Sequence, residues 1–139
     1  MRPPHIAIVD DDESVCRSVS RLLRQMNMEA TAFHSVPDFL DSPMRTAFTC
    51  LVLDVQLGTG MTGFELRQHL LEGGDCTPVI FLTAYDDPQT QAQAKRFESA
   101  IVRKGADPQS LIEAIRKAKR PRFAFVPTPQ KEGKPQKEG

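Results

Sequence analysis

Residues Cys50–Gly58 have the sequence CLVLDVQLG, and this stretch decides the fold. A largely apolar run, Cys50–Leu53, ends at a single carboxylate, Asp54. A short, continuous apolar run bounded by turn residues is typical of a strand that is buried on both faces, as in a parallel sheet. Open α/β sheets bind their ligands at the carboxyl ends of such strands, so Asp54 is the first candidate functional residue.

Two other segments have the same form. Ile6–Val9 leads into the three aspartates Asp10–Asp12, and Val79–Leu82 leads into Thr83. Because parallel strands place their carboxyl ends at one edge of the sheet, these strands should bring carboxylates and a hydroxyl group together. This convergence is the main functional signal in the sequence.

The whole chain alternates between strand and helix patterns. We expect strands at 5–9, 29–33, 49–53, 77–82 and 99–102, each followed by a helix. This alternation predicts an α/β fold with a flavodoxin-like five-stranded parallel sheet, strand order 2-1-3-4-5, and helices on both faces. We expect the first helix to bury one face, formed by Val15, Val19, Leu22, Leu23 and Met26. The fourth helix offers little beyond Ala92 and Phe97 to bury.

Length and composition suggest one domain at residues 1–119 followed by a different kind of segment. The chain has 139 residues, and its basic and acidic residues balance at 18 each, so net charge favours neither nucleic acid nor a membrane. No long apolar run or signal peptide is present, and the three cysteines lack a CxxC spacing. We therefore expect a cytoplasmic protein with reduced, structural thiols.

Residues 120–139 form a Pro- and Lys-rich tail that we expect to be disordered. They carry five basic and two acidic groups, which leaves residues 1–119 with a net charge of −3. The exception within the tail is Phe123–Val126, sequence FAFV, a small apolar patch that could bind the domain or a partner.

The acids at the strand ends favour a divalent cation. Two carboxylates about 4 Å apart repel each other by roughly 4 kcal/mol at an effective dielectric constant near 20. Asp10, Asp11 and Asp54 would therefore need a cation to remain ionised together, and Mg²⁺ suits an all-oxygen ligand set. A soft metal is disfavoured because zinc-like spacings of His and Cys are absent from the sequence.

Thr83 and Lys104 each stand at the carboxyl end of a further expected strand. Together with Mg²⁺, a hydroxyl and an ammonium group could hold a phosphoryl group, with Asp54 as the nucleophile that accepts it. The alternative is that the acids are helix caps and Lys104 is a surface charge. Convergence at four strand ends favours the functional interpretation.

At these positions the chain resembles the receiver domain of two-component response regulators, similar to the chemotaxis regulator and to nitrogen-fixation-type receivers. The resemblance covers residues 5–119 and rests on the motifs IVDDDE, LVLDVQL, FLTA and IVRK, in that order. Each motif alone is weak, but the set is specific.

The resemblance implies that a histidine kinase phosphorylates Asp54 and that the backbone carbonyl of Gln56 completes the Mg²⁺ ligands. Asp11 and Asp54 would be direct ligands, and Asp10 would act through water. Lys104 would bind a phosphoryl oxygen, and Thr83 would move to hydrogen-bond it.

The chain departs from the family pattern in informative places. Gly58 replaces the usual proline after the phospho-acceptor, and Gly105 replaces the proline after the lysine. Ile101 stands where the family carries a Tyr or Phe that rotates inward on activation. Gln56 and Tyr85 occupy rate-modulating positions, and a bulky ring at Tyr85 predicts a long-lived phosphoryl group.

Several functions remain open at this stage. The first is a single-domain response regulator that receives phosphate from a sensor histidine kinase or phosphotransfer protein and signals to an unknown output protein. A phosphorelay intermediate or a phosphate-independent binding module are the alternatives. We expect no enzyme activity beyond its own phosphorylation and dephosphorylation, because a dehalogenase-type phosphatase needs its nucleophile on the first strand. Because only the tail follows Lys119, we also expect no direct DNA binding, and no membrane association.

Overall fold

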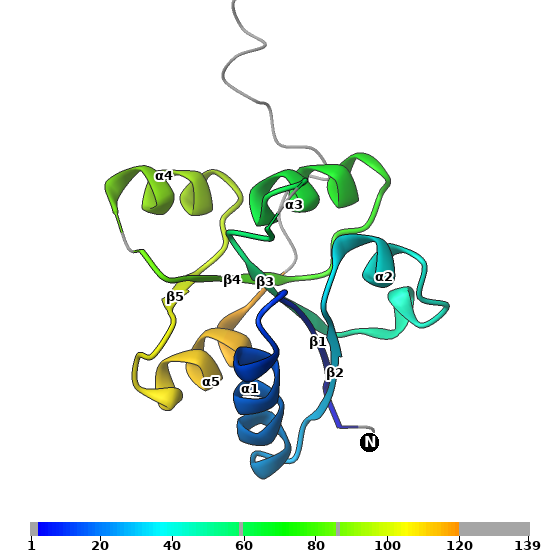
Figure 1. The fold of residues 1–139 in the computed structure, drawn as a ribbon, viewed down its shortest axis with the longest axis vertical. Coiled ribbons are helices and arrows are strands. Elements are labelled where there is room, and N and C mark those ends of the chain that lie inside the picture. Colours follow the sequence, from blue (N-terminus) through cyan, green and yellow to red (C-terminus); the bar gives the residue numbers. More distant parts are fainter. Residues whose placement is uncertain (1–2, 59, 86, 120–139) are drawn as a thin grey trace, which may run out of the picture.

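The computed structural model describes residues 3–58, 60–85 and 87–119, and within them the chain forms one five-stranded parallel sheet (Figure 1). The strand order is β2-β1-β3-β4-β5, which confirms the predicted flavodoxin-like fold. The strands are β1 His5–Val9, β2 Glu29–Phe33, β3 Cys50–Asp54, β4 Val79–Thr83 and β5 Ile101–Arg103. The helices are α1 Glu13–Gln25, α2 Val36–Leu40, α3 Gly63–Glu72, α4 Pro88–Arg96 and α5 Pro108–Lys117, with a 3₁₀ turn, η1, at Arg45–Ala47.

The helices form two layers that bury the sheet. α1 and α5 cover one face, and α2, α3 and α4 cover the other (Figure 1). Alternate residues of the central strands contribute to the two cores: Val52 and Ile80 to the α1/α5 side, and Leu53 and Phe81 to the other. Because both faces are covered, all five residues of β3 are buried, as the continuous apolar run predicts.

Capping side chains determine where the helices begin. The Asp12 carboxylate accepts hydrogen bonds from the backbone N–H groups of Ser14 and Val15, and the Thr62 hydroxyl and Glu65 form a capping box. Proline occupies the first turn of α2, α4 and α5, where its missing N–H has no helical partner to lose.

The strands extend further toward the site than predicted. β3 includes Asp54 and β4 includes Thr83, whereas the apolar pattern ended both strands one residue earlier. Ladder pairing explains the difference, because Asp54 pairs with Leu82, and Thr83 pairs with Arg103. The side chains of Asp54 and Thr83 are therefore held by the sheet itself.

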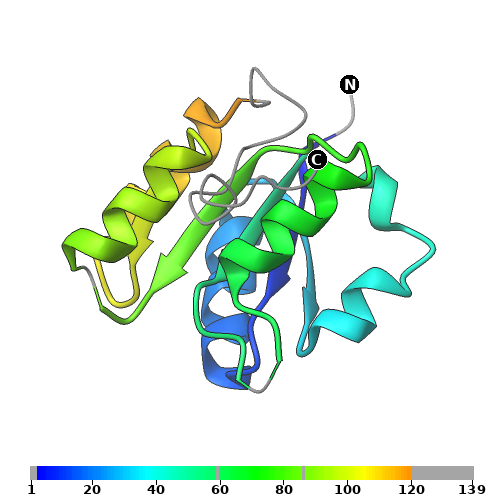
Figure 2. The ribbon, with the colours of Figure 1, turned by 90° about the horizontal axis from the view of Figure 1, so that it is seen from above.

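The predicted buried face of α1 is confirmed in part, and that of α4 is wrong in detail. In α1 the fully buried positions are Cys16, Ser20 and Leu23, while Val15, Val19, Leu22 and Met26 are only partly buried. Leu23 belongs to the core on this side of the sheet and the other four predicted residues pack against it, so the apolar pattern marks the correct face of the helix. In α4, Ala94 is buried beside Phe97 and Ala92 is exposed. Figure 2 shows α4 and α3 crossing the same side of the sheet.

The predicted disorder of residues 120–139 lies outside the described residues. Among the residues that are described, no helix has the length and apolar character needed to cross a membrane.

Candidate functional site at the carboxyl edge of the sheet

Backbone pairing brings four chain segments to one edge of the sheet. The Asp10 N–H donates to the Phe33 carbonyl at 3.0 Å just beyond β1. The N–H groups of Val55 and Lys104 donate to the carbonyls of Leu82 at 2.8 Å and Thr83 at 2.7 Å. The residues that follow β1, β3 and β5 are therefore held against the ends of neighbouring strands.

Three aspartates meet at this edge. Asp10, Asp11 and Asp54 each offer a carboxylate oxygen, and these oxygens lie within 4.8 Å of one another. Asp10 is fully buried and Asp54 is 2% exposed, while Asp11 is exposed. The clustering predicted from the strand pattern is present.

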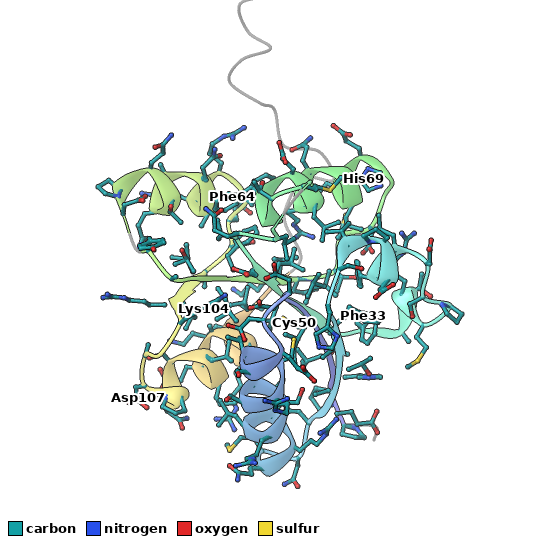
Figure 3. The ribbon with its side chains drawn as sticks, viewed as in Figure 1. Phe33, Cys50, Phe64, His69, Lys104 and Asp107 are labelled. Atoms are coloured by element: carbon teal, nitrogen blue, oxygen red, sulfur yellow. The ribbon has the colours of Figure 1, made fainter. Side chains whose placement is uncertain are left out.

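The two buried carboxylates are oriented in the same way. One oxygen of each accepts a backbone hydrogen bond from the residue two positions later: Asp10 from Asp12 at 2.9 Å and Asp54 from Gln56 at 3.1 Å. The other oxygen of each faces Lys104, whose Nζ lies 3.0 Å from both Oδ2 atoms. Lys104 extends from the loop after β5 near the carboxyl ends of the central strands (Figure 3).

Burial and neighbouring charges shift the pKa values of Asp54 and Lys104. Burial raises the pKa of Asp54 to about 6; the Lys104 contact opposes this shift, and the nearby Asp10 carboxylate adds to it. Burial alone lowers the pKa of Lys104, but its contacts with Asp10 and Asp54 leave that pKa above the ordinary value. Three carboxylates face one ammonium group, so the cluster carries excess negative charge. A bound cation would neutralise that charge.

The ligand set fits a hard divalent cation. All three side chains offer carboxylate oxygens, the donors that Mg²⁺ prefers, and Asp11 keeps the cluster open to solvent. Gln56 is exposed and its N–H contacts Asp54. The role of its carbonyl as a ligand stays a prediction.

Two glycines allow the chain to close around the cluster. A Cβ on Gly63 would collide with the Asp54 carbonyl oxygen, so glycine lets α3 begin directly against the end of β3. A Cβ on Gly58, which has φ +75°, would lie 2.8 Å from Asp11 Oδ2. The glycine that replaces the usual proline therefore lies against the aspartate cluster.

Thr83 is buried, and its hydroxyl group is already engaged. It donates to the Tyr85 carbonyl at 2.7 Å and accepts from the Tyr85 N–H at 3.0 Å. The Tyr85 side chain is 71% exposed. Its predicted shielding of the phosphoryl group stays a prediction.

Ile101 is partly buried against the α2–α4 side of the core and pairs with Phe81 in the sheet. On that side the Phe64 and Phe81 rings pack with centroids 4.6 Å apart, and Phe97 joins them. Phe64, on α3, is labelled in Figure 3. The aliphatic side chain at 101 thus belongs to the packed core.

Two further buried residues support the elements around the site: Cys16, which the sequence predicts to be a structural thiol, and Arg67, which the sequence does not single out. Cys16 is buried in α1, and its thiol donates to the Asp10 carbonyl at 3.3 Å, which supports the segment that carries the acids. Arg67 is fully buried in α3 and donates to the Thr77 carbonyl at 2.7 Å. No sequence signal separates this arginine from the exposed ones of other helices.

Comparisons with known proteins identify the family. The model of the response regulator receiver domain matches residues 6–116, which covers most of the chain. This chain belongs to the response regulator receiver domain family. The match confirms the family that the four sequence motifs predict.

Curated relatives agree with this family. The chain is 37% identical over 114 residues to transcriptional regulatory protein TdiR of Thauera aromatica, covering 81% of this chain and 50% of TdiR. It is 33% identical over 132 residues to response regulator protein TmoT of Ectopseudomonas mendocina, covering 94% of this chain and 57% of TmoT. The chain spans about half the length of the curated relatives it matches.

Solved structures agree with the fold. A response regulator receiver protein from Burkholderia phymatum superposes with a TM-score of 0.67 at 33% identity, covering 81% of this chain and 94% of that one. Chemotaxis protein CheY4 of Vibrio cholerae superposes with a TM-score of 0.74, covering 84% of this chain and 99% of that one. At 22% identity, the second match supports the fold alone.

These relatives correct one expectation. The absence of direct DNA binding was inferred from how few residues follow Lys119, and that inference is wrong. Relatives such as TdiR, and FixJ of Azorhizobium caulinodans, are named transcriptional regulatory proteins, and this chain covers only about half of each. A receiver domain is one part of such regulators. The number of residues after Lys119 therefore does not indicate whether the protein acts on DNA.

Proposed function

We propose that this receiver accepts a phosphoryl group on Asp54 in a Mg²⁺-dependent reaction. The observation that supports this most directly is the position of Lys104, whose Nζ lies 3.0 Å from the carboxylates of both Asp54 and Asp10. Asp11 adds a solvent-facing oxygen to the same cluster. Phosphoryl transfer requires a nucleophile, a positive charge beside it and ligands for a hard metal ion. Asp54, the Lys104 ammonium group and the three carboxylates would supply them.

The proposed reaction is an in-line displacement at phosphorus. An oxygen of the Asp54 carboxylate attacks the phosphorus atom of a kinase phosphohistidine, and the P–N bond breaks as the new P–O bond forms. The imidazole leaves with the electron pair of the broken bond, and the product is an aspartyl acyl phosphate. Bound Mg²⁺ would neutralise charge on the transferring oxygens.

The chain's own residues have separate roles in this scheme. The Gln56 N–H holds one Asp54 oxygen, which leaves Oδ2, now beside Lys104, as the attacking atom. Lys104 would then pair with a phosphoryl oxygen and keep its contact with Asp10. The Thr83 hydroxyl would exchange its hydrogen bonds with Tyr85 for one with the phosphoryl group.

The output is also a proposal. The relatives named as transcriptional regulatory proteins favour a signal that ends in the control of transcription. The aliphatic Ile101 favours a second candidate, a relay that passes phosphate to another histidine, because a relay needs the acceptor site but no aromatic switch. We expect the chain to catalyse no reaction beyond its own phosphorylation and dephosphorylation.

Acetyl phosphate with Mg²⁺, monitored by intact mass spectrometry, tests the proposal. We expect the mass to increase by one phosphoryl group, and the adduct to be absent in Asp54→Ala and in wild type with EDTA. Lys104→Ala should bind Mg²⁺ but form the adduct far more slowly. Failure of folded, Mg²⁺-bound wild type to form an adduct would contradict the proposal and favour a phosphate-independent binding module.

A further inference from the structure

We propose that the apolar segment Phe123–Val126 of this same chain binds in the groove between α1 and α5. The groove encloses about 470 Å³ and lies between one face of α1 and the first half of α5, which share one side of the sheet (Figure 1). The groove has a partly exposed apolar wall, and the segment follows α5 closely in the chain.

The groove wall includes an apolar stripe that the fold covers only in part. Val15, Val19 and Leu22 follow one another at helical spacing on α1, and all three line the groove and remain partly exposed. Val102 and Leu111 line the opposite wall. Side chains with the spacing of a buried face, left partly exposed in a hollow, indicate a surface that another apolar group covers.

The linker after α5 is long enough for the segment to reach the groove. α5 ends at Lys117 and Phe123 is the sixth residue after it, so the five residues between them span at most about 18 Å. Helices that follow parallel strands run back across the sheet, so α1 and α5 end at the same edge; Figure 2 shows α5 running toward the side where the described chain begins. Gln25, the last residue of α1, lines the groove at that edge.

The sequence of the segment suits an extended, one-sided ligand. Pro121 and Pro127 bracket it, and a residue before proline favours extended backbone. In an extended segment alternate side chains share a face, so Phe123 and Phe125 would point the same way. Four extended residues cover about 13 Å, and the α1 wall from Val15 to Leu22 is about 11 Å long.

Tethering favours this occupant over a separate molecule. The segment is joined to α5 by a short linker, so its effective concentration at the groove is in the millimolar range. Even weak burial of two phenyl rings would then fill the groove for much of the time. The basic residues Arg120 and Arg122 both precede the segment in the chain.

NMR on the full chain tests this proposal. Spectra of wild type are compared with those of Phe123→Ser/Phe125→Ser and of the control Lys131→Ser/Lys134→Ser, which alters the tail but not its apolar patch. We expect the phenylalanine variant to shift the Val15, Val19 and Leu22 methyl resonances and to reduce amide hydrogen-exchange protection across α1. The lysine variant should leave both unchanged.

A substitution in the groove gives the reciprocal test. Val19→Arg should release the segment, which would appear as narrowed, random-coil resonances for residues 123–126. Unchanged groove resonances in the phenylalanine variant would overturn the proposal. Shifts that vanish on dilution of wild type would also overturn it, because they would assign the groove to a second copy of the chain.

Discussion

The Thr83 hydroxyl and the backbone of Tyr85 are joined by two hydrogen bonds, one in each direction, at 2.7 and 3.0 Å. Thr83 is buried in the sheet, whereas the Tyr85 ring is 71% exposed. The hydroxyl that we expect to contact a phosphoryl group therefore also holds the position of an exposed aromatic residue. Since each hydrogen bond contributes about 1 kcal/mol, breaking both should free the backbone at Tyr85.

This relationship predicts a fluorescence change on phosphorylation. Tyr85 is the single tyrosine and the chain has no tryptophan, so intrinsic fluorescence reports on this residue alone. We expect acetyl phosphate with Mg²⁺ to change the emission of wild type and of Thr83→Ser, which retains the hydroxyl. Thr83→Val should accept phosphate without that change, and Asp54→Asn should show neither. An equal change in wild type and Thr83→Val would contradict the coupling.

Asp54→Asn should stabilise the metal-free protein at pH 7. The folded state raises the pKa of Asp54 from 3.8 to about 6, mainly through burial, so the folded state binds a proton more tightly than the unfolded state. Stability from this group is therefore greatest below about pH 4 and is lost as pH rises through 6. Asparagine does not ionise, and its gain at pH 7 is at most about 3 kcal/mol.

Urea unfolding in EDTA between pH 4 and pH 8 measures this effect. The free energy of unfolding of wild type should fall relative to Asp54→Asn as pH increases from 4 to 6, and the difference should then level off. Added Mg²⁺ should stabilise wild type more than the variant. Parallel pH profiles would show that Asp54 has an ordinary pKa in the folded state.

The sequence predicts the topology and the acid cluster because both follow from strand ends. A continuous apolar run marks a strand of a doubly covered sheet, and the residue after it must lie at the sheet edge. Asp10, Asp54, Thr83 and Lys104 were therefore identifiable without coordinates. The structure adds the distances that join them through Lys104.

Other features depend on packing that the sequence does not encode locally. In α1 the buried positions also include Cys16 and Ser20, which the apolar pattern does not single out, because they lie beside Leu23 on the side that faces the sheet. The hydrogen bonds of Thr83 depend on the path of the loop that follows it. Arg67 is buried because α3 places it over the start of β4, and a helix pattern cannot indicate that location.

Substitution of Arg67 should lower the free energy of unfolding without affecting phosphorylation at Asp54. Its guanidinium is fully buried and donates to the Thr77 carbonyl at 2.7 Å, and burial lowers its pKa to about 10. Arg67→Ala leaves that carbonyl unpaired and opens a cavity, so we expect a loss of about 4 kcal/mol in the free energy of unfolding. Arg67→Met fills most of the volume and should lose about 1–2 kcal/mol.

Urea midpoints give these differences, and the acetyl phosphate reaction provides the control. Thr77 precedes β4, whereas Asp54 ends β3, so the two lie at opposite edges of the sheet. Folded Arg67→Met should therefore be phosphorylated at the wild-type rate. A large decrease in that rate would show that the buried arginine acts on the site.

Gly58→Ala and Gly60→Ala form a matched pair that tests how the loop after β3 supports Mg²⁺ binding. Both glycines have positive φ, +75° and +104°, so alanine costs each a similar strain of about 1 kcal/mol. Only the Cβ at position 58 would meet the Asp11 carboxylate, at 2.8 Å, while a Cβ at position 60 meets nothing within 4 Å. We expect Gly58→Ala to displace Asp11 and weaken Mg²⁺ affinity about tenfold, a change of about 1.4 kcal/mol. Isothermal titration calorimetry measures this affinity, and Gly60→Ala should bind Mg²⁺ as wild type does; equal weakening in the two variants would assign the effect to backbone strain rather than to Asp11.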